Sequence, residues 1–229
     1  MTSSGTYSFS PSAADLVLNA FGKLQIRSHE LSAAHLQDAA MEANLLMIDI
    51  SNRNPNRWLM ETQTVPLVLA APTYNLAART ISVTVATLNQ TGAGDRTIGP
   101  ISAADYASYP VKTQPGPPSA YLFNLAVVPT ITVWPVPDAA VIAAGGVLSL
   151  MTFRQAQDVN LASGETIDSP YRFLDAFTTG LASRLAEIYR PEKAGNLNVL
   201  YEQRFARAQK RDQENVPISI APNFSGYYR

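Results

Sequence analysis

Hydrophobic positions recur at the 3.6-residue period of a helix in four stretches of the chain, two near its start and two after residue 169. A serine stands where each of the first three helices is expected to begin, at Ser10, Ser32 and Ser169. Pro191 is expected to end the third helix and to begin the fourth. Each hydrophobic stripe is one-sided, so the four helices are expected to pack against one another or against a sheet.

Between residues 58 and 153 the hydrophobic period changes to two, which is typical of β-strands. The alternation appears in residues 81–85 and 130–134, and residues 147–153 form a further apolar run. Turns rich in Gly and Pro separate these segments. Short strands with frequent turns and no long helix between them predict an antiparallel sheet or a small sandwich.

Together these patterns predict an α+β fold: a four-helix bundle with an inserted antiparallel β domain and an extended C-terminal tail. The expected domains are a helical domain made of residues 1–57 and 154–213, an inserted β domain of residues 58–153, and a docking tail of residues 214–229. The two helical halves are expected to pair in space, with the β domain projecting from them.

The tail is hydrophobic although it follows the last expected helix. An alternating segment is followed by aromatic residues, and its candidate anchors are Val216, Ile218, Ile220, Phe224, Tyr227 and Tyr228. Three interpretations remain open: the tail is disordered, it folds back onto its own β domain, or it adds a strand or aromatic anchors to another subunit. Pro217 and Pro222 suit an edge strand, because proline cannot donate to a hydrogen-bond ladder.

Composition narrows the class of protein. Of the 229 residues, 46% are hydrophobic and 15% are charged, against about 25% charged in an average protein. A core is therefore possible, and a surface so poor in charge suits a protein that works inside an assembly. The net charge of -1 argues against a protein that grips nucleic acid over its whole surface. The chain has no cysteine, and we expect no signal peptide and no membrane helix, which indicates a soluble protein made in a cytoplasm.

Candidate chemistry is sparse. The histidines are His29 and His35, with no nucleophile elbow near either, and both are expected to be surface residues. The carboxylates Asp158, Glu165 and Asp168 cluster in one loop without the spacing of a calcium loop, and the last two are expected near a helix N-terminus. The sequence therefore predicts no enzyme, no catalytic residue, no metal site and no cofactor.

A basic stripe is the most informative charged feature. Its residues lie at the end of the last expected helix and are Arg204, Arg207, Lys210 and Arg211. One interpretation is favourable interaction with the helix dipole. The other is a docking face for an acidic partner, and a protein fits better than DNA because affinity for DNA grows with the number of phosphates neutralised. The stripe and the tail anchors together are the predicted partner-binding residues.

Several segments, in this order along the chain, resemble one family. They are SFSPSAADLVLNAFGKLQIR, AHLQDAAMEANLLMIDISNRNPNRW, ITVWPVPD, FRQAQDVN and PYRFLDAFTTGLASRLAEIYRP, followed by a helix ending in DQEN. The chain is similar, from Ser8 to Ile220, to the head-to-tail adaptors of tailed bacteriophages, in particular those of short-tailed phages.

This resemblance implies a structural protein of the virion, placed at the head–tail junction and assembled in the host cytoplasm. It implies a homo-oligomeric ring of twelve subunits, with the portal protein on one side and a tail or nozzle protein on the other. DNA would pass through the lumen without specific binding, and no membrane would be involved. By this likeness, Arg204 to Arg211 and the tail from Val216 onward would face the portal.

Two hypotheses of other classes stay open. The β insertion could be a receptor- or glycan-binding module, whose candidate stacking rings are Trp58, Tyr74, Tyr106, Tyr109, Tyr121 and Trp134. A cell-wall hydrolase is the third hypothesis, although no residues in the sequence point to its chemistry.

Overall fold

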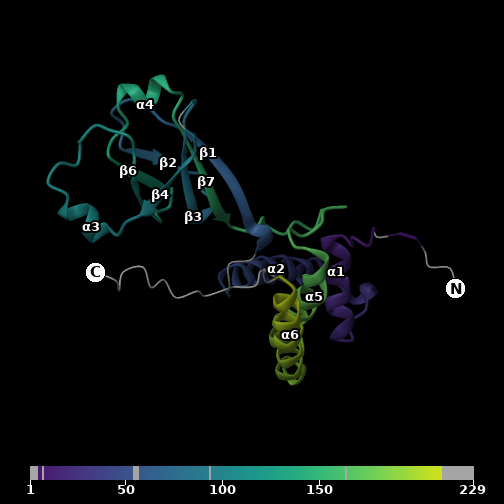
Figure 1. Ribbon diagram of the computed structural model, residues 1–229. Helices are drawn as coiled ribbons and strands as arrows, with labels where there is room; N and C mark the ends of the chain where they lie inside the picture. Colours follow the sequence, from purple (N-terminus) through teal and green to yellow (C-terminus); the bar gives the residue numbers. More distant parts are fainter. Residues whose placement is uncertain (1–4, 7, 54–56, 93, 163, 213–229) are drawn as a thin grey trace, which may run out of the picture.

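The computed structural model describes residues 5–212 except for residues 7, 54–56, 93 and 163. Figure 1 shows two regions, which we name the helical region and the sheet region. The helical region contains α1 (Ala13–Lys23), α2 (Ala33–Arg53), α5 (Leu174–Tyr189) and α6 (Pro191–Asp212). The sheet region contains β1 (Met60–Pro66), β2 (Thr73–Asn75), β3 (Thr80–Asn89), β4 (Arg96–Pro100), β5 (Ala120–Asn124), β6 (Thr130–Trp134), β7 (Val147–Arg154) and the short helices α3 (Ala103–Ser108) and α4 (Ala139–Ala143).

The predicted four-helix bundle is wrong, although the α+β class is consistent with the structure. The described residues form six helices, and the main helix contacts of the helical region all involve α5, which packs against α1, α2 and α6. In a bundle each helix keeps one face for solvent, whereas ten of the sixteen residues of α5 are buried. Small and hydroxyl residues allow α5 to be covered on several sides. Gly180 leaves room for the ring of Tyr201, and the hydroxyls of Thr178 and Thr179 donate to backbone carbonyls four residues earlier in the helix.

Helix starts follow the expected chemistry but not always the expected residue. α1 is capped by Ser12 rather than Ser10: the Ser12 hydroxyl accepts from the backbone N–H of Asp15 at 3.1 Å, and the Asp15 carboxylate accepts from the backbone N–H of Ser12 at 3.2 Å. After Ser169 and Pro170 the chain first forms the 3₁₀ turn η3 (Tyr171–Phe173), so that α5 begins only at Leu174.

The strands form one curled sheet of seven strands in the order β1-β7-β3-β4-β5-β6-β2. All neighbouring pairs are antiparallel except β4 and β5, which are parallel. The sheet is therefore mostly antiparallel but not purely so, in contrast to the prediction. Leu148 and Leu150 of β7 are fully buried together with Ala86 and Leu88 of β3, so this face of the strands forms the core of the sheet region.

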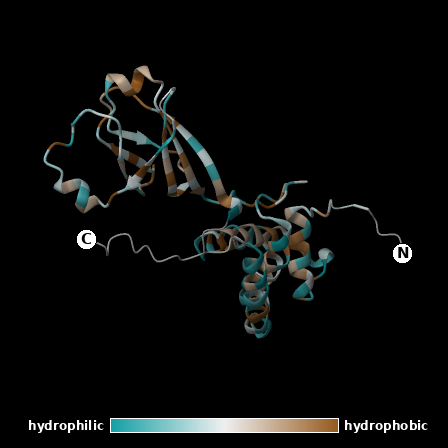
Figure 2. Ribbon diagram, in the orientation of Figure 1, coloured by the Kyte–Doolittle hydropathy of each residue, from teal (hydrophilic) through white to brown (hydrophobic). Residues whose placement is uncertain are grey.

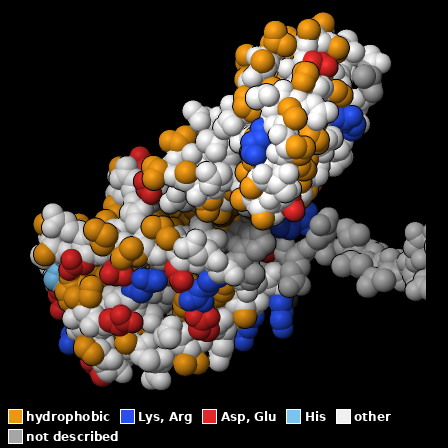
Figure 3. Space-filling model, turned by 90° about the vertical axis from the view of Figure 1, so that its left-hand side faces the viewer, with side chains coloured by type: hydrophobic (Ala, Val, Ile, Leu, Met, Phe, Trp, Pro, Cys, Tyr) orange, Lys and Arg blue, Asp and Glu red, His pale blue; other side chains and the backbone are white. Residues whose placement is uncertain are grey.

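Two separate clusters of buried residues lie in the two regions, and Figure 2 shows hydrophobic segments in both. Phe177 and Leu181 of α5 are central to the helical cluster, whereas Leu150 and Ile131 belong to the sheet cluster. The division into domains at residues 57, 153 and 213 stays a prediction. One difference between the regions is plain: Figure 3 shows few charged side chains on the sheet region and many on the helical region.

A polar junction joins the end of β7 to the loop before α5. The guanidinium of Arg154 donates to both oxygens of Asp168, at 2.5 and 3.0 Å, and lies 3.9 Å from the carboxylate of Glu61. Asp168 also accepts from the backbone N–H of Gln157 at 2.9 Å. The hydrogen bond from Arg154 holds the pKa of the Asp168 carboxyl below its usual value, despite partial burial. Asp168 therefore fixes the sheet region on the helical region and is not simply a charge at a helix N-terminus.

Candidate partner-binding site

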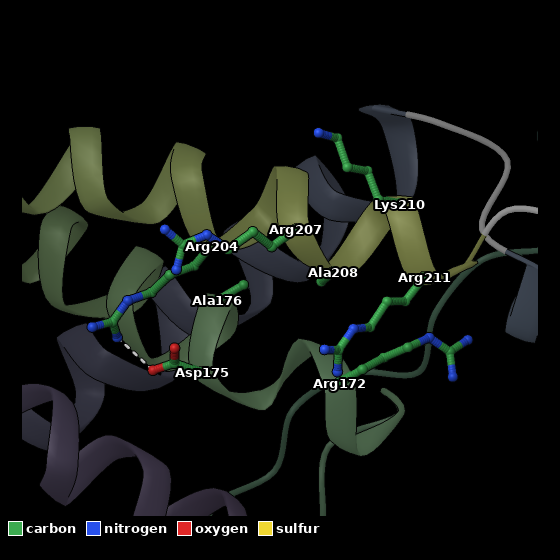
Figure 4. A pocket seen from close by; sticks show the side chains of 8 residues that line it. All are labelled: Arg172, Asp175, Ala176, Arg204, Arg207, Ala208, Lys210 and Arg211. Atoms are coloured by element: carbon green, nitrogen blue, oxygen red, sulfur yellow. Dashed lines mark hydrogen bonds and ion pairs between the residues drawn. The ribbon is translucent and has the colours of Figure 1, made fainter.

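A basic groove of about 410 Å³ lies along the C-terminal half of α6 (Figure 4). We name it the cationic groove, and its lining residues are Arg172, Asp175, Ala176, Arg204, Arg207, Ala208, Lys210 and Arg211. Five of the eight are cations and one is an acid. The structure thus brings together all four residues of the predicted basic stripe and adds Arg172 from η3, which is near none of them in sequence.

The buried face of α6 sets the direction of these side chains. Tyr201, Phe205 and Ala208 are buried against the helical core, and their spacing of four and three residues defines one face of the helix. Arg204, Arg207 and Arg211 are three and four residues apart and so form a neighbouring stripe, which projects beside this face toward α5 and η3. Figure 4 shows Lys210 pointing away from the other cations.

Two of the five cations are already paired. Arg204 forms an ion pair with Asp175 and donates to the hydroxyl of Thr179 at 2.7 Å. Arg172 forms an ion pair with Asp212. Arg207, Lys210 and Arg211 are exposed and make no ion pair with any residue that the structure describes.

Lys23 adds a further cation that the sequence did not single out. Its ammonium group, at the end of α1, donates to Thr179 at 2.8 Å. Burial lowers the pKa of Lys23, Arg204 lowers it further, and Asp175 opposes them. Lys23 and Asp175 also line a second hollow of about 590 Å³ between α1 and α5. The cationic groove and this hollow share Asp175, and the hollow itself holds one cation, Lys23, and two acids, Asp15 and Asp175.

Asp212 holds the end of α6 beside the end of α2. Its carboxylate accepts from the backbone N–H of Arg57 at 3.0 Å, in addition to the pair with Arg172. Nearby, Arg53 at the end of α2 donates to Glu202 at 2.7 and 2.8 Å. The tail therefore leaves the fold beside both the cationic groove and the end of α2. The predicted tail anchors, from Val216 to Tyr228, lie outside the described residues, and their role in binding stays a prediction.

His35 lies in the first turn of α2, whereas His29 is exposed in the 3₁₀ turn η1 (Ser28–Glu30) before it. The Nδ1 atom of His35 accepts from the backbone N–H of Ser32 at 3.2 Å and lies 2.7 Å from its hydroxyl. The ring of His35 stacks on Tyr189 at 4.6 Å, and Tyr189 donates to Asp38. Burial raises the pKa of Tyr189 to about 12, and the bond to Asp38 adds to this. His35 thus acts as a capping residue, and Asp38 is engaged by a phenol.

Metal ligands do not converge within the part of the chain that the structure describes. Of the three loop carboxylates, Asp168 is bound by Arg154. The same described residues contain no helix long and apolar enough to cross a bilayer.

The aromatic candidates of the sheet region are mostly engaged with their own fold. Tyr121 is buried, the hydroxyl of Tyr74 donates to Ala71 at 2.9 Å, and Trp58 packs on Phe173 at 4.5 Å between ring centroids. The remaining three rings form one cluster: Tyr106, Tyr109 and Trp134, with Tyr109 lying 4.3 Å from Trp134. One face of Trp134 is therefore covered by Tyr109.

A second surface lies on the outside of β1, β7 and β3, and we name it the sheet outer face. The strand register places Thr62, Met151 and Val85 in one row. A second row across the same strands consists of Thr64, Ser149 and Thr87. Met151 and Val85 are about two-fifths exposed, and neither row contains a charged residue.

Residues 13–221 match the protein family described as SU10 adaptor protein. No curated protein matches the chain. The matched range includes every helix and strand described above.

Proposed function

Because the chain belongs to the SU10 adaptor protein family, a family of phage head-to-tail adaptors, we propose that its subunits form a ring that joins the portal to the tail. Such an adaptor is a structural component of the virion at the head–tail junction. The proposed ring has twelve subunits in a closed head-to-tail arrangement, in which each subunit uses two different surfaces for its two neighbours.

The observation that carries the proposal is the cationic groove at the point where the tail leaves α6. Arg207, Lys210 and Arg211 are exposed, and they are free of ion pairs among the described residues. A cluster of exposed cations favours a partner with carboxylates at the surface, because opposite charges steer association and fix orientation. We assign this face, together with the tail, to the portal.

The sheet region fits a different role in the same ring. Residues 58–153 contain only seven charged residues, and the sheet outer face contains none. DNA is retained by cations that neutralise its phosphates, so a surface with few cations lets DNA slide past it. The sheet region would therefore line the channel or contact a neighbouring subunit, and DNA would pass without specific binding.

The direct test is to mix the purified protein with its portal and image the particles. We expect rings attached to the portal, and a chain ending at Asn215 should fold but fail to attach. The charge-reversing substitutions Arg207→Glu, Lys210→Glu and Arg211→Glu, made together, should also abolish attachment. Normal attachment of both variants would contradict the assignment of this face to the portal, and absence of any ring with the portal would contradict the ring itself.

A further inference from the structure

The side of α2 that faces away from α5 carries no charge. We name it the α2 outer face, and its residues are Ala34, Gln37, Met41, Leu45, Ile48 and Asn52. All six are exposed, and Met41, Leu45 and Ile48 are exposed by 62%, 42% and 43%. A helix face in contact with water usually carries charged residues. The composition of the α2 outer face therefore indicates that something covers it.

The charged residues of α2 lie along the edge of this face, and their side chains are engaged toward α5 and α6. Asp38 accepts from Tyr189, Glu42 lies 3.4 Å from Arg184, and Asp49 pairs with Arg53 at 3.0 Å. Arg53 in turn bonds to α6. Because every ionic residue of the helix is used toward α5 and α6, the occupant of the α2 outer face is expected to be uncharged and apolar.

The tail begins close to this face. α6 ends at Asp212, whose carboxylate is bonded to the backbone of Arg57, four residues beyond the last residue of α2. Residues 213–229 can span up to about 56 Å when extended. The distance along α2 from Asn52 to Met41 is only about 17 Å, and a helix is about 10–12 Å across. The tail is thus long enough to pass around the end of α2 and to run along its outer face.

The chemistry of the tail matches this surface. Residues 213–229 contain only Glu214 and Arg229 as charged residues. In an extended chain, Val216 and Ile220 lie about 13 Å apart, which is similar to the roughly 10.5 Å between Ile48 and Met41 on a helix. Pro217 and Pro222 have no N–H to donate, so a segment that binds through its side chains leaves fewer backbone donors unpaired.

We propose that, in the free subunit, residues 216–228 lie along the α2 outer face of the same chain. The tether favours this occupant over a second copy, because a short flexible linker gives a millimolar effective concentration. One consequence rests on the function proposed above: when the portal captures the tail, the α2 outer face becomes available to a neighbouring subunit. Ring formation would then follow binding to the portal.

The test uses disulfide trapping in the full chain, which contains no cysteine of its own. The variant combines Leu45→Cys with Ile218→Cys, and the matched control combines Gln203→Cys, on the exposed face of α6, with Ile218→Cys. After mild oxidation we expect an intramolecular disulfide in the first variant and much less in the control, read by non-reducing electrophoresis and intact mass. Equal trapping in both would overturn the proposal. Intermolecular dimers or ladders in the first variant would also overturn it, in favour of a second copy on this face.

Attachment to the portal separates this inference from the proposed function. We expect the oxidised Leu45→Cys, Ile218→Cys chain to attach at least tenfold less than the same chain after reduction. If the chain is trapped, but neither its reduced form nor the unsubstituted protein attaches to the portal, the contact between the tail and the α2 outer face stands and the proposed binding to the portal is wrong. If the chain attaches to the portal but no disulfide forms, binding to the portal stands and the contact between the tail and the α2 outer face is wrong.

Discussion

The helical region and the sheet region stabilise themselves by different means. In the helical region, charged residues are paired between helices, as in Arg53 with Glu202 and Arg184 with Glu42. In the sheet region, residues 58–153 hold seven charged residues, against 17 Lys and Arg and 18 Asp and Glu in the whole chain. Here hydroxyl groups supply polar contacts between strands: the hydroxyls of Thr73 and Thr132, on neighbouring strands, are hydrogen-bonded at 2.9 Å. Charged pairs thus fix the orientation of the helices in the helical region, whereas the sheet region presents a nearly neutral surface.

The largest expected effect tests whether the two cores are independent. Phe177 and Leu150 are both fully buried, one in each cluster. Phe177→Ala should lower the free energy of unfolding of the helical region by about 3–5 kcal/mol, and Leu150→Ala that of the sheet region by about 2–5 kcal/mol, because each leaves a cavity. Urea unfolding followed by hydrogen exchange in each region measures this. If either substitution weakens both regions equally, the two cores form one cooperative unit.

A smaller effect is expected where α5 meets α6. A Cβ atom at Gly180 would lie 2.8 and 2.9 Å from ring carbons of Tyr201 and 3.1 Å from Leu46. Gly180→Ala should therefore destabilise the helical region by about 2 kcal/mol through overpacking, measured by urea unfolding. Gly195→Ala is the matched control in α6, because nothing lies within 4 Å of its added Cβ. That change should stabilise the fold by about 0.5–1 kcal/mol, and an equal loss in both variants would show that the close contact at Gly180 is not limiting.

The junction between the regions should respond to pH. Because Arg154 lowers the pKa of Asp168, this carboxylate contributes stability above its ordinary pKa of about 4, and the contribution is lost as the pH falls below that value. Asp168→Asn should cost about 1–2 kcal/mol at pH 7, since a hydrogen bond to a charged partner is removed. The cost should be much smaller at pH 3, as measured by urea unfolding at both values. A cost that does not change with pH would place the stabilisation elsewhere.

The smallest effect on stability, and the clearest on binding, is expected in the cationic groove. Each of the changes Arg207→Glu, Lys210→Glu and Arg211→Glu should lower the free energy of unfolding by less than about 1 kcal/mol, because all three residues are exposed and lose mainly an interaction with the helix dipole. Attachment to the portal should fall at least tenfold, more strongly at low salt than at high salt. Gln203→Glu, on the exposed face of α6 outside the groove, is the control for a change of charge alone. Equal loss in the control would show that the groove is not the binding face.

The sequence predicted the helices better than their arrangement. Periodicity identified the four long helices, because each has a clear buried stripe. It did not reveal that α5 is central, although Gly180 and the hydroxyl residues Thr178, Thr179 and Ser183 are the signal. A helix covered on several sides needs small residues where a neighbour comes close, and its buried hydroxyls bond to backbone carbonyls. The cap of α1 was expected one serine too early, because Ser10 and Ser12 both precede the same hydrophobic stripe.

The candidate site was predicted only where its residues share one helix. Arg204, Arg207 and Arg211 follow helical spacing and could be found from the pattern. Lys23 and Arg172 come from other elements, and only packing around α5 places them nearby. In the same way, alternation in residues 81–85 and 130–134 predicted β3 and β6, and the apolar run 147–153 predicted β7, whereas β2 and β4 are too short to show a period.

The clamp at Asp212 has a mechanical consequence. A pull on residue 213 would load the Asp212 carboxylate, which is held both by the backbone N–H of Arg57 and by the guanidinium of Arg172. The tension would therefore divide between the segment after α2 and the turn before α5, and α6 would not be peeled off from its end. A subunit gripped by its tail would transmit force into two parts of its fold at once.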